Sequence, residues 1–348
     1  MIYTIIVAGL IAFGVGLYIV PLFAKAAIKH NIVDNPDGKV KIHSKSIPYL
    51  GGLAIYMAVV VSLAFTIYLD KRLTGLLLGG TIIVLIGLID DFMKLTPLQK
   101  LIGQVLAVTI AIRSGIYIQR TAIPYIFHVP LTYLWVLATI NAFNLLDGID
   151  GQATSISIIA TGTFLFFAII NNDPGLMVFC TALLFSLFAF LIYNSFPASI
   201  FMGDTGSMFL GLTIGVLSIT TEYSGVTKFS LLAPLLILSL PFFNVTYVIF
   251  IRLINGVPIA RATLDQWHDN LKRIGFNTPQ IVLISSVFSL LFSILGIILV
   301  YTNLLYSIII LSIATIILLI IFTIFASLKN KELPELNNLS SPSQLADD

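Results

Sequence analysis

Residues 128–151 read HVPLTYLWVLATINAFNLLDGIDG, an apolar run that ends in a polar island. A helix needs about 20 apolar residues to cross a bilayer, because each residue adds about 1.5 Å along its axis. The run therefore predicts one membrane-spanning helix over residues 128–146. Its last part, NAFNLLDGIDG, gathers two asparagines, two aspartates and two glycines at one end of that helix.

The composition extends this prediction to the whole chain. Of its 348 residues, 58% are hydrophobic and only 10% are charged, whereas soluble domains carry about 25% charged residues. We therefore expect an all-α, polytopic membrane protein with about eleven transmembrane helices and a single integral-membrane domain over residues 1–328. The polar tail, residues 329–348, is expected to be disordered. The predicted spans are residues 3–23, 47–69, 74–90, 98–113, 128–146, 153–171, 175–193, 206–222, 229–251, 280–301 and 303–327.

The basic residues predict the orientation of the chain. With eleven spans and the N-terminus outside, only five basic residues fall on the outer side, so 13 of the 18 Lys and Arg residues are inside. The positive-inside rule requires such an excess. We therefore expect a cytoplasmic C-terminus and a multi-pass protein of the cell (plasma) membrane. The five outer residues are Lys71, Arg72, Arg113, Arg120 and Lys228.

Five of the sixteen acidic residues lie in three clusters, each at a predicted cytoplasmic helix end. The clusters are GLIDDFMK with Asp90 and Asp91, NAFNLLDGIDG with Asp147 and Asp150, and NSFPASIFMGDTGS with Asp204. Ionisable groups at membrane depth cost roughly 2.5–3.5 kcal/mol each and are usually functional. Carboxylates brought together also repel one another unless a cation offsets their charge. The pattern favours one shared site for a hard divalent cation, Mg²⁺ with Mn²⁺ as its substitute.

The spacing within the clusters supports a polar cavity. Asn141, Asn144 and Asp147 step by three residues, so they share an arc of about 120° on a helix. Asp90 and Lys94 are four residues apart and lie on one face, suited to metal and phosphate respectively. Each cluster alone also has a structural explanation, since DG pairs are ordinary turn chemistry. Three clusters on one face make a wholly structural origin the weaker interpretation.

Four motifs carry a resemblance to a known family. They are DNPDGKVKIHSKSIPYLGG (34–52), GLIDDFMKLTPLQKLIGQ (87–104), NAFNLLDGIDG (141–151) and NSFPASIFMGDTGSMFLG (194–211). With them the chain resembles the polyprenyl-phosphate N-acetylhexosamine-1-phosphate transferases, glycosyltransferase family 4. That family includes the undecaprenyl-phosphate N-acetylglucosamine-1-phosphate transferases and the phospho-N-acetylmuramoyl-pentapeptide transferases.

The resemblance implies a magnesium-dependent reaction. A polyprenyl (undecaprenyl) phosphate would accept a sugar 1-phosphate, most simply GlcNAc 1-phosphate, from a UDP-sugar, giving polyprenyl-diphosphate-sugar and UMP. This would be the first membrane step of a cell-envelope glycan pathway, with the active site on the cytoplasmic face. The expected partners are the lipid phosphate, the UDP-sugar and the membrane, with no nucleic acid and with a homodimer left open.

The resemblance also implies roles for individual residues. Asp90, Asp91, Asp147 and Asp150 would be catalytic, and Asp204 with Asp147 would bind the metal. The phosphate acceptor is mostly dianionic at neutral pH, so a general-base role for Asp90 or Asp91 is left open. The residues expected to bind substrate are Lys41, His43, Lys94, Lys100, Asn141, Asn144, Asn194, Arg261, Asp265 and His268.

One loop departs from the family pattern. Where the family carries several histidines, residues 261–275 read RATLDQWHDNLKRIG and keep only His268. This loop faces the sugar nucleotide in the family, so the departure leaves the identity of the sugar open. It also leaves open a second interpretation, in which the chain is a catalytically weakened relative that binds lipid phosphate. A third is an ion-coupled transporter, although transporters place their sites near the bilayer midplane and not at one face.

Overall fold

The computed structural model describes residues 1–34, 46–66, 70–119, 124–223, 227–258 and 265–339, with side chains as far as residue 328 in the last helix. Most of these residues are helical, which confirms the all-α prediction, and each predicted apolar stretch coincides with a helix or a broken helix. The long helices are α1 (Ile2–Lys29), α2 (Gly51–Thr66), α3 (Lys71–Met93), α4 (Pro97–Arg113), α5 (His128–Leu146), α6 (Gln152–Ile170), α7 (Pro174–Asn194), α8 (Gly203–Thr220), α10 (Ser239–Ile254), α12 (Thr278–Tyr301) and α13 (Leu304–Leu339). The shorter elements are β1 (Val33–Asp34), β2 (Ile47–Pro48), η1 (Tyr125–Phe127), η2 (Lys228–Leu232), α9 (Ala233–Ile237) and α11 (Trp267–Ile274).

Seven helices in the described ranges are long and apolar enough to cross a membrane. An eighth span results if residues 228–237 and α10, which meet at a bend of 73°, are counted together. α2 and α4 have only 16 and 17 residues, and α8 begins with the polar segment GDTGS. The chain is thus a multi-pass membrane protein, while the count of eleven spans and the orientation stay predictions. α13 continues as a helix to Leu339, past the boundary at residue 328 that composition predicts.

Side-chain caps fix the starts of several helices. The Asp70 carboxylate accepts a hydrogen bond from Leu73 N (2.7 Å) before α3, and Asp173 accepts one from Leu176 N (3.0 Å) before α7. Thr96 and the side chain of Gln99 form a capping box at α4. Such caps satisfy backbone N–H groups that have no partner within the helix.

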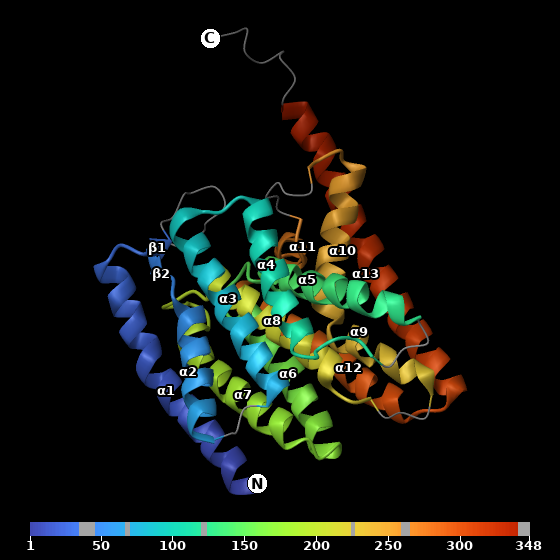
Figure 1. Cartoon of the computed structure of the whole chain (residues 1–348). Coiled ribbons are helices and arrows are strands. Elements are labelled where there is room, and N and C mark those ends of the chain that lie inside the picture. Colours follow the sequence, from blue (N-terminus) through green and yellow to red (C-terminus); the bar gives the residue numbers. More distant parts are fainter. Residues whose placement is uncertain (35–45, 67–69, 120–123, 224–226, 259–264, 340–348) are drawn as a thin grey trace.

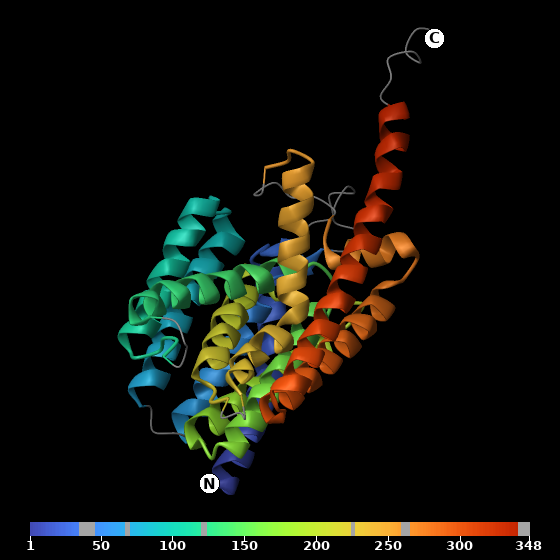
Figure 2. The same cartoon turned by 90° about the vertical axis from the view of Figure 1, so that its right-hand side faces the viewer.

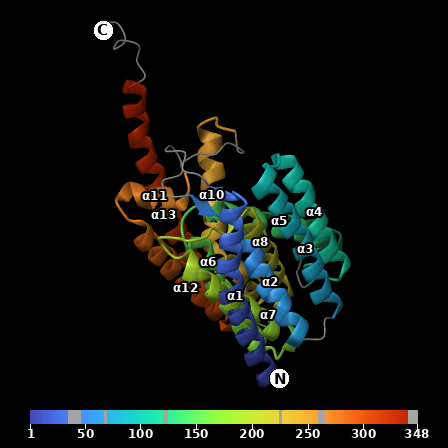
Figure 3. The ribbon, with the colours of Figure 1, turned by 90° about the vertical axis from the view of Figure 1, so that its left-hand side faces the viewer.

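The helices form one bundle. α1 packs along α2 and α7 at one side (Figure 3), and it begins at the end of the molecule opposite to the end of α13 (Figure 1). α5 runs across its neighbours in both perpendicular views (Figures 1 and 2). β1 and β2 pair antiparallel, with Val33 opposite Pro48. Phe201 N donates to Pro48 O (2.9 Å), so β2 is tied to the segment that leads into α8.

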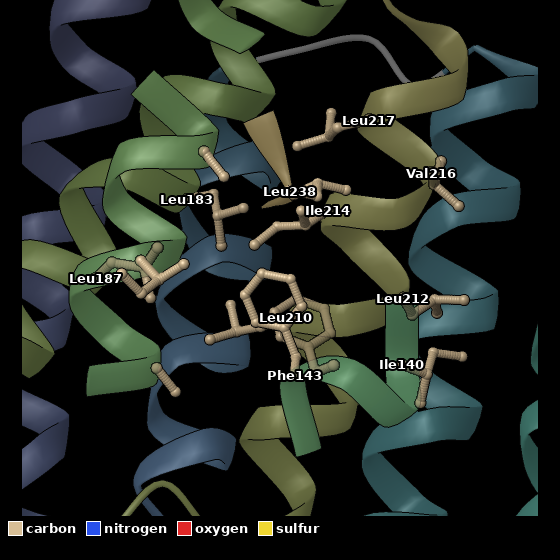
Figure 4. Close-up of a cluster of buried hydrophobic side chains, with 14 of the residues drawn as sticks. Ile140, Phe143, Leu183, Leu187, Leu210, Leu212, Ile214, Val216, Leu217 and Leu238 are labelled. Carbon is tan, nitrogen blue, oxygen red and sulfur yellow. The ribbon is translucent and has the colours of Figure 1, made fainter. Parts of the chain in front are cut away.

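α8 is the central helix of the bundle. Its residues from Thr205 to Ser218 are all buried, and it contacts α2, α3, α5 and α6. Figure 4 shows Leu210 and Ile214 on one side of α8 and Leu212 and Val216 on another. A helix that is buried on all sides contacts neighbouring helices on every face, so it has no face left for solvent or lipid. Its first turn, which carries Asp204, packs closely on α3, since a Cβ on Gly87 would lie 2.4 Å from Thr205 Cα.

Candidate functional site

Three chain segments bring the predicted acidic clusters together at one end of the bundle. They are the last turn of α3, the break between α5 and α6, and the first turn of α8. Between them lies a cavity of about 1050 Å³. Among the predicted residues, the cavity is lined by Asp90, Asp91, Lys94, Asn144, Asp147, Asp150, Asn194 and Asp204.

Lys100 links two of the carboxylates. Its Nζ lies 2.6 Å from Asp90 Oδ2 and also contacts Asp204 Oδ2. The other oxygen of Asp90 accepts a hydrogen bond from Leu95 N (2.7 Å), just after the end of α3. One ammonium group thus balances two carboxylates that would otherwise repel each other.

Asn144 holds Asp204 from the opposite side. Its Nδ2 donates to Asp204 Oδ1 (2.9 Å) and to Ser207 Oγ (3.0 Å). Asn141, three residues earlier, instead exchanges hydrogen bonds with Gln104 of α4 (2.9 Å) and does not line the cavity. Of the polar face predicted for this helix, only Asn144 and Asp147 line the cavity.

Asp91 points into the start of α8. Its Oδ1 accepts from Asp204 N (2.8 Å), and its Oδ2 accepts from Thr205 N (3.2 Å) and Thr205 Oγ1 (2.6 Å). A carboxylate oxygen at a helix N-terminus satisfies N–H groups that lack a partner in the helix. The two adjacent aspartates thus have different surroundings, one beside a lysine and one beside helix amides.

Asp147 follows the last residue of α5 and is partly buried. Burial, and then the negative charges of Asp204, Asp91 and Asp150, raise the pKa of Asp147 to about 8. Within the described ranges no group donates a hydrogen bond to this carboxylate. Among the described cavity carboxylates, Asp147 thus has neither a hydrogen-bond donor nor a basic partner.

Asp150 and Asn194 order the chain around this break. The Asp150 carboxylate accepts from Ala198 N (2.9 Å). Asn194 Oδ1 accepts from Gly151 N (3.2 Å) and Thr154 Oγ1 (2.8 Å), while its Nδ2 donates to Ile200 O (3.1 Å). The two polar side-chain atoms of Asn194 make these three hydrogen bonds to protein, so Asn194 holds the wall of the cavity.

Within the altered loop, residues Trp267–Ile274 form α11, and the two described residues that were predicted to bind substrate are buried. His268 and Asp265 are 5% and 3% exposed, and neither lines the cavity. Burial lowers the pKa of His268 to about 4, so the imidazole is neutral at physiological pH. A Cβ on Gly148 would lie 2.1 Å from His268 Cε1, so the ring packs directly against the DGIDG break.

Sequence reasoning missed several residues that line the cavity. Lys272, Phe276 and Asn277 reach it from the end of α11 and the start of α12, where the sequence gives no distinct signal. Asp34 and Tyr49 also line it, and both belong to a motif quoted above, so that signal was available. Burial and the nearby Asp34 raise the pKa of Tyr49 above its usual range. Lys41, His43 and Arg261 lie outside the described residues.

The donor set suits Mg²⁺ better than a transition metal. No three or more His, Cys, Asp or Glu side chains form a ready-made metal site in the part of the chain that is described. Mg²⁺, however, usually takes one or two carboxylates and completes its shell with waters and substrate phosphates. Asp204 and Asp147, which has no hydrogen-bond donor among the described residues, fit that requirement, because both line one cavity and interact electrostatically.

Comparisons with known proteins agree with the sequence motifs. Residues 73–222 match the family described as glycosyl transferase family 4. The probable undecaprenyl-phosphate N-acetylglucosaminyl 1-phosphate transferase of Bacillus subtilis (strain 168) is 34% identical over 304 residues, 85% of each chain. The phospho-N-acetylmuramoyl-pentapeptide-transferase of Thermoanaerobacter sp. (strain X514) is 34% identical over 68% of this chain and 79% of its own. That of Carboxydothermus hydrogenoformans is 26% identical over 82% of this chain and 94% of its own.

Proposed function

Because the chain belongs to glycosyl transferase family 4, we propose that it transfers N-acetylhexosamine 1-phosphate from a UDP-sugar to polyprenyl phosphate. The observation that carries this proposal is that Asp90, Asp147, Asp204 and Lys94 line the same cavity, with Lys100 paired to two of the carboxylates. The products would be polyprenyl-diphosphate-sugar and UMP.

The reaction depends more on neutralising the negative charge of its two substrates than on a strong base. One oxygen of the lipid phosphate forms a bond to the sugar-bearing phosphorus, and the bond from that phosphorus to the bridging oxygen breaks, so UMP leaves with that oxygen. Both reactants are anionic, and a phosphate monoester is mostly dianionic near pH 7. Catalysis then rests on aligning two anions and neutralising the charge between them.

We assign this task to a few residues of the cavity. Asp204 and Asp147 would hold Mg²⁺, or Mn²⁺ as its substitute, which would neutralise diphosphate oxygens when bound. Lys100, and Lys94 at the cavity edge, would then meet phosphate charge. Asp90 lies beside Lys100, and its charge would orient that ammonium toward the acceptor.

GlcNAc is the sugar we favour. The relative named for N-acetylglucosaminyl 1-phosphate transfer matches over 85% of this chain, and the pentapeptide transferase at equal identity matches over 68%. The undecaprenyl acceptor is taken from the name of the first relative. The cytoplasmic location of the cavity rests on the orientation expected from the basic residues, and the role in envelope glycan synthesis rests on the family resemblance; both are parts of the proposal. A homodimer remains a separate expectation from sequence.

A transfer assay tests the proposal. Purified protein in detergent would be incubated with polyprenyl phosphate, Mg²⁺ and UDP-sugars labelled in the sugar, including UDP-GlcNAc and UDP-GalNAc. We expect labelled lipid and an equal amount of UMP with UDP-GlcNAc. Absence of product with every sugar, from protein that elutes as one folded species, would contradict the proposed function.

A further inference from the structure

The first turn of α8 carries Asp204 but has no cap of its own. Met202 occupies the N-cap position and makes no side-chain hydrogen bond to the helix. Hydrophobic residues are poor N-caps, because a helix start leaves up to four N–H groups without partners. Asp91, 113 residues away in sequence from Asp204, supplies the missing acceptor.

The Asp91 carboxylate meets this turn with both oxygens. Asp204 N donates to Oδ1 at 2.8 Å, while Thr205 N and Thr205 Oγ1 donate to Oδ2 at 3.2 and 2.6 Å. A carboxylate has about four lone-pair sites, so three of them are in use. Negative charge at a helix N-terminus is itself favourable, which strengthens the contact.

Two glycines allow this approach. Gly87 lies one turn before Asp91 on the same face of α3, and a Cβ there would lie 2.4 Å from Thr205 Cα. Gly203 has φ of +70°, and a Cβ there would lie 2.7 Å from Asp91 Oδ2. Any side chain larger than hydrogen at either position would separate α3 from α8. The backbone of α3 and α8 is thus in direct contact where the cap forms.

We propose that Asp91 is a positioning residue, which caps α8 and thereby fixes the Asp204 carboxylate in the cavity. The Asp204 side chain itself is held by Asn144 and Lys100. A metal ligand must be held to about 0.5 Å, which side-chain contacts alone do not guarantee. This inference rests on the proposed function for its consequence in catalysis, but not for the contact itself.

The contact can be tested without turnover. Hydrogen exchange of a peptide covering the start of α8 would be compared in wild type, Asp91→Asn, Thr205→Val and Thr205→Ser. Thr205 is fully buried and does not line the cavity, so its variants change the cap without touching substrate. We expect faster exchange at this turn in Asp91→Asn and Thr205→Val, and wild-type exchange in Thr205→Ser, which keeps the hydroxyl.

Mn²⁺ binding and the pH profile then test what the cap does. We expect Thr205→Val to weaken Mn²⁺ binding by about 3- to 10-fold, as for the loss of one buried hydrogen bond, and Thr205→Ser to match wild type. Asp91→Asn should weaken it further, while the pH profile of its residual transfer keeps the wild-type shape. The proposal is contradicted if Asp91→Asn has wild-type exchange and wild-type Mn²⁺ affinity, but lower turnover and a pH profile without its acidic limb. Asp91 would then act directly on the substrate.

The two proposals fail in different ways. If wild type binds Mn²⁺ and shows the exchange pattern above but transfers no sugar phosphate, the cap stands and the proposed function fails. If Thr205→Val does not fold, Asp91→Asn carries the same comparison alone, with Asp204→Asn as the reference for lost Mn²⁺ binding. Unchanged exchange at α8 in a folded Asp91→Asn protein overturns the inference.

Discussion

Asp204 is bonded on both carboxylate oxygens, by Asn144 on one and by Lys100 on the other. The same lysine contacts Asp90, so one ammonium group offsets the charge of two carboxylates. A buried or half-buried ion pair that loses one partner leaves an uncompensated charge, which costs far more than an exposed pair. The charge balance at Lys100 is therefore the most sensitive point of the site.

We expect Lys100→Met to reduce transfer by about 100- to 1000-fold, the usual effect of removing one preorganised charge at a reacting centre. The methionine keeps the length of the side chain but leaves Asp90 and Asp204 to repel each other. UMP release measures the effect. Lys71→Met is the control, because this exposed residue starts α3 at the opposite end of the helix. Equal activity of both variants would remove Lys100 from the mechanism.

His268 links pH to stability. Its pKa is about 4 in the folded protein, because burial disfavours the charged ring, against 6.5 for the free residue. The unfolded chain therefore binds the proton more readily between these values, so folding stability is full above pH 6.5 and falls as the pH drops toward 4. The loss amounts to about 3 kcal/mol.

We therefore expect the melting temperature in detergent to fall between pH 6.5 and 4, and His268→Gln to reduce that slope. Glutamine does not titrate, and it is close to histidine in size. The unfolding temperature at each pH is the measurement, with wild type and variant run in the same buffers. An identical pH dependence in the variant would show that another group causes the loss.

At the scale of elements, the site depends on how closely α3 and α8 approach. Gly87 faces the backbone of Thr205, whereas Gly162 in α6 has no heavy atom within 4 Å of its Cβ position. The two glycines offer a matched pair, because both lie inside long helices. The same substitution has opposite consequences at the two positions.

We expect Gly87→Ala to lower the melting temperature and to reduce transfer at least 10-fold, because the new methyl group must push α8 and Asp204 away. Overpacking of this kind typically costs about 1–3 kcal/mol. Gly162→Ala should retain activity and stability, since alanine favours a helix by about 1 kcal/mol over glycine. Wild-type behaviour of Gly87→Ala would mean that the α3–α8 contact does not govern the site.

The sequence predicted the three acidic clusters well, because a polar island in an apolar chain is a local signal. Asp90, Asp147 and Asp204 line one cavity as expected. The position of α11 was not predictable in this way, because distant side chains fix it. Trp267 N donates to Asn244 of α10 (2.7 Å), and Trp267 Nε1 donates to Ser285 of α12 (2.9 Å).

The adjacent aspartates show the same limit. Apart from the four-residue spacing of Asp90 to Lys94, nothing local distinguishes Asp90 from Asp91, since both lie near the end of α3. Their difference comes from Lys100 for one and from the start of α8 for the other. Asn141 does not line the cavity for a related reason, because its side chain is hydrogen-bonded to Gln104 of α4.

At the scale of the whole molecule, the orientation predicted from basic residues remains to be measured. Cys180 is the only cysteine in the sequence and is fully buried. A cysteine introduced at an exposed position can therefore be labelled while Cys180 stays unreactive. Leu98, at the start of α4, is 66% exposed at the cavity end, and Lys71 is exposed at the other end.

We expect a membrane-impermeant maleimide to label Lys71→Cys but not Leu98→Cys in intact cells whose outer surface is accessible. Both should react after the membrane is opened, which controls for exposure. Labelling of Leu98→Cys alone in intact cells would place the cavity outside and reverse the predicted orientation.

In the proposed reaction a sugar phosphate, and not a bare sugar, moves to the lipid. UDP-GlcNAc carrying ³²P in the phosphate next to the sugar distinguishes the two outcomes in one reaction with polyprenyl phosphate and Mg²⁺. We expect the ³²P to appear in the lipid fraction and the released nucleotide to be unlabelled UMP. Release of labelled UDP, with no ³²P in the lipid, would contradict the proposed reaction.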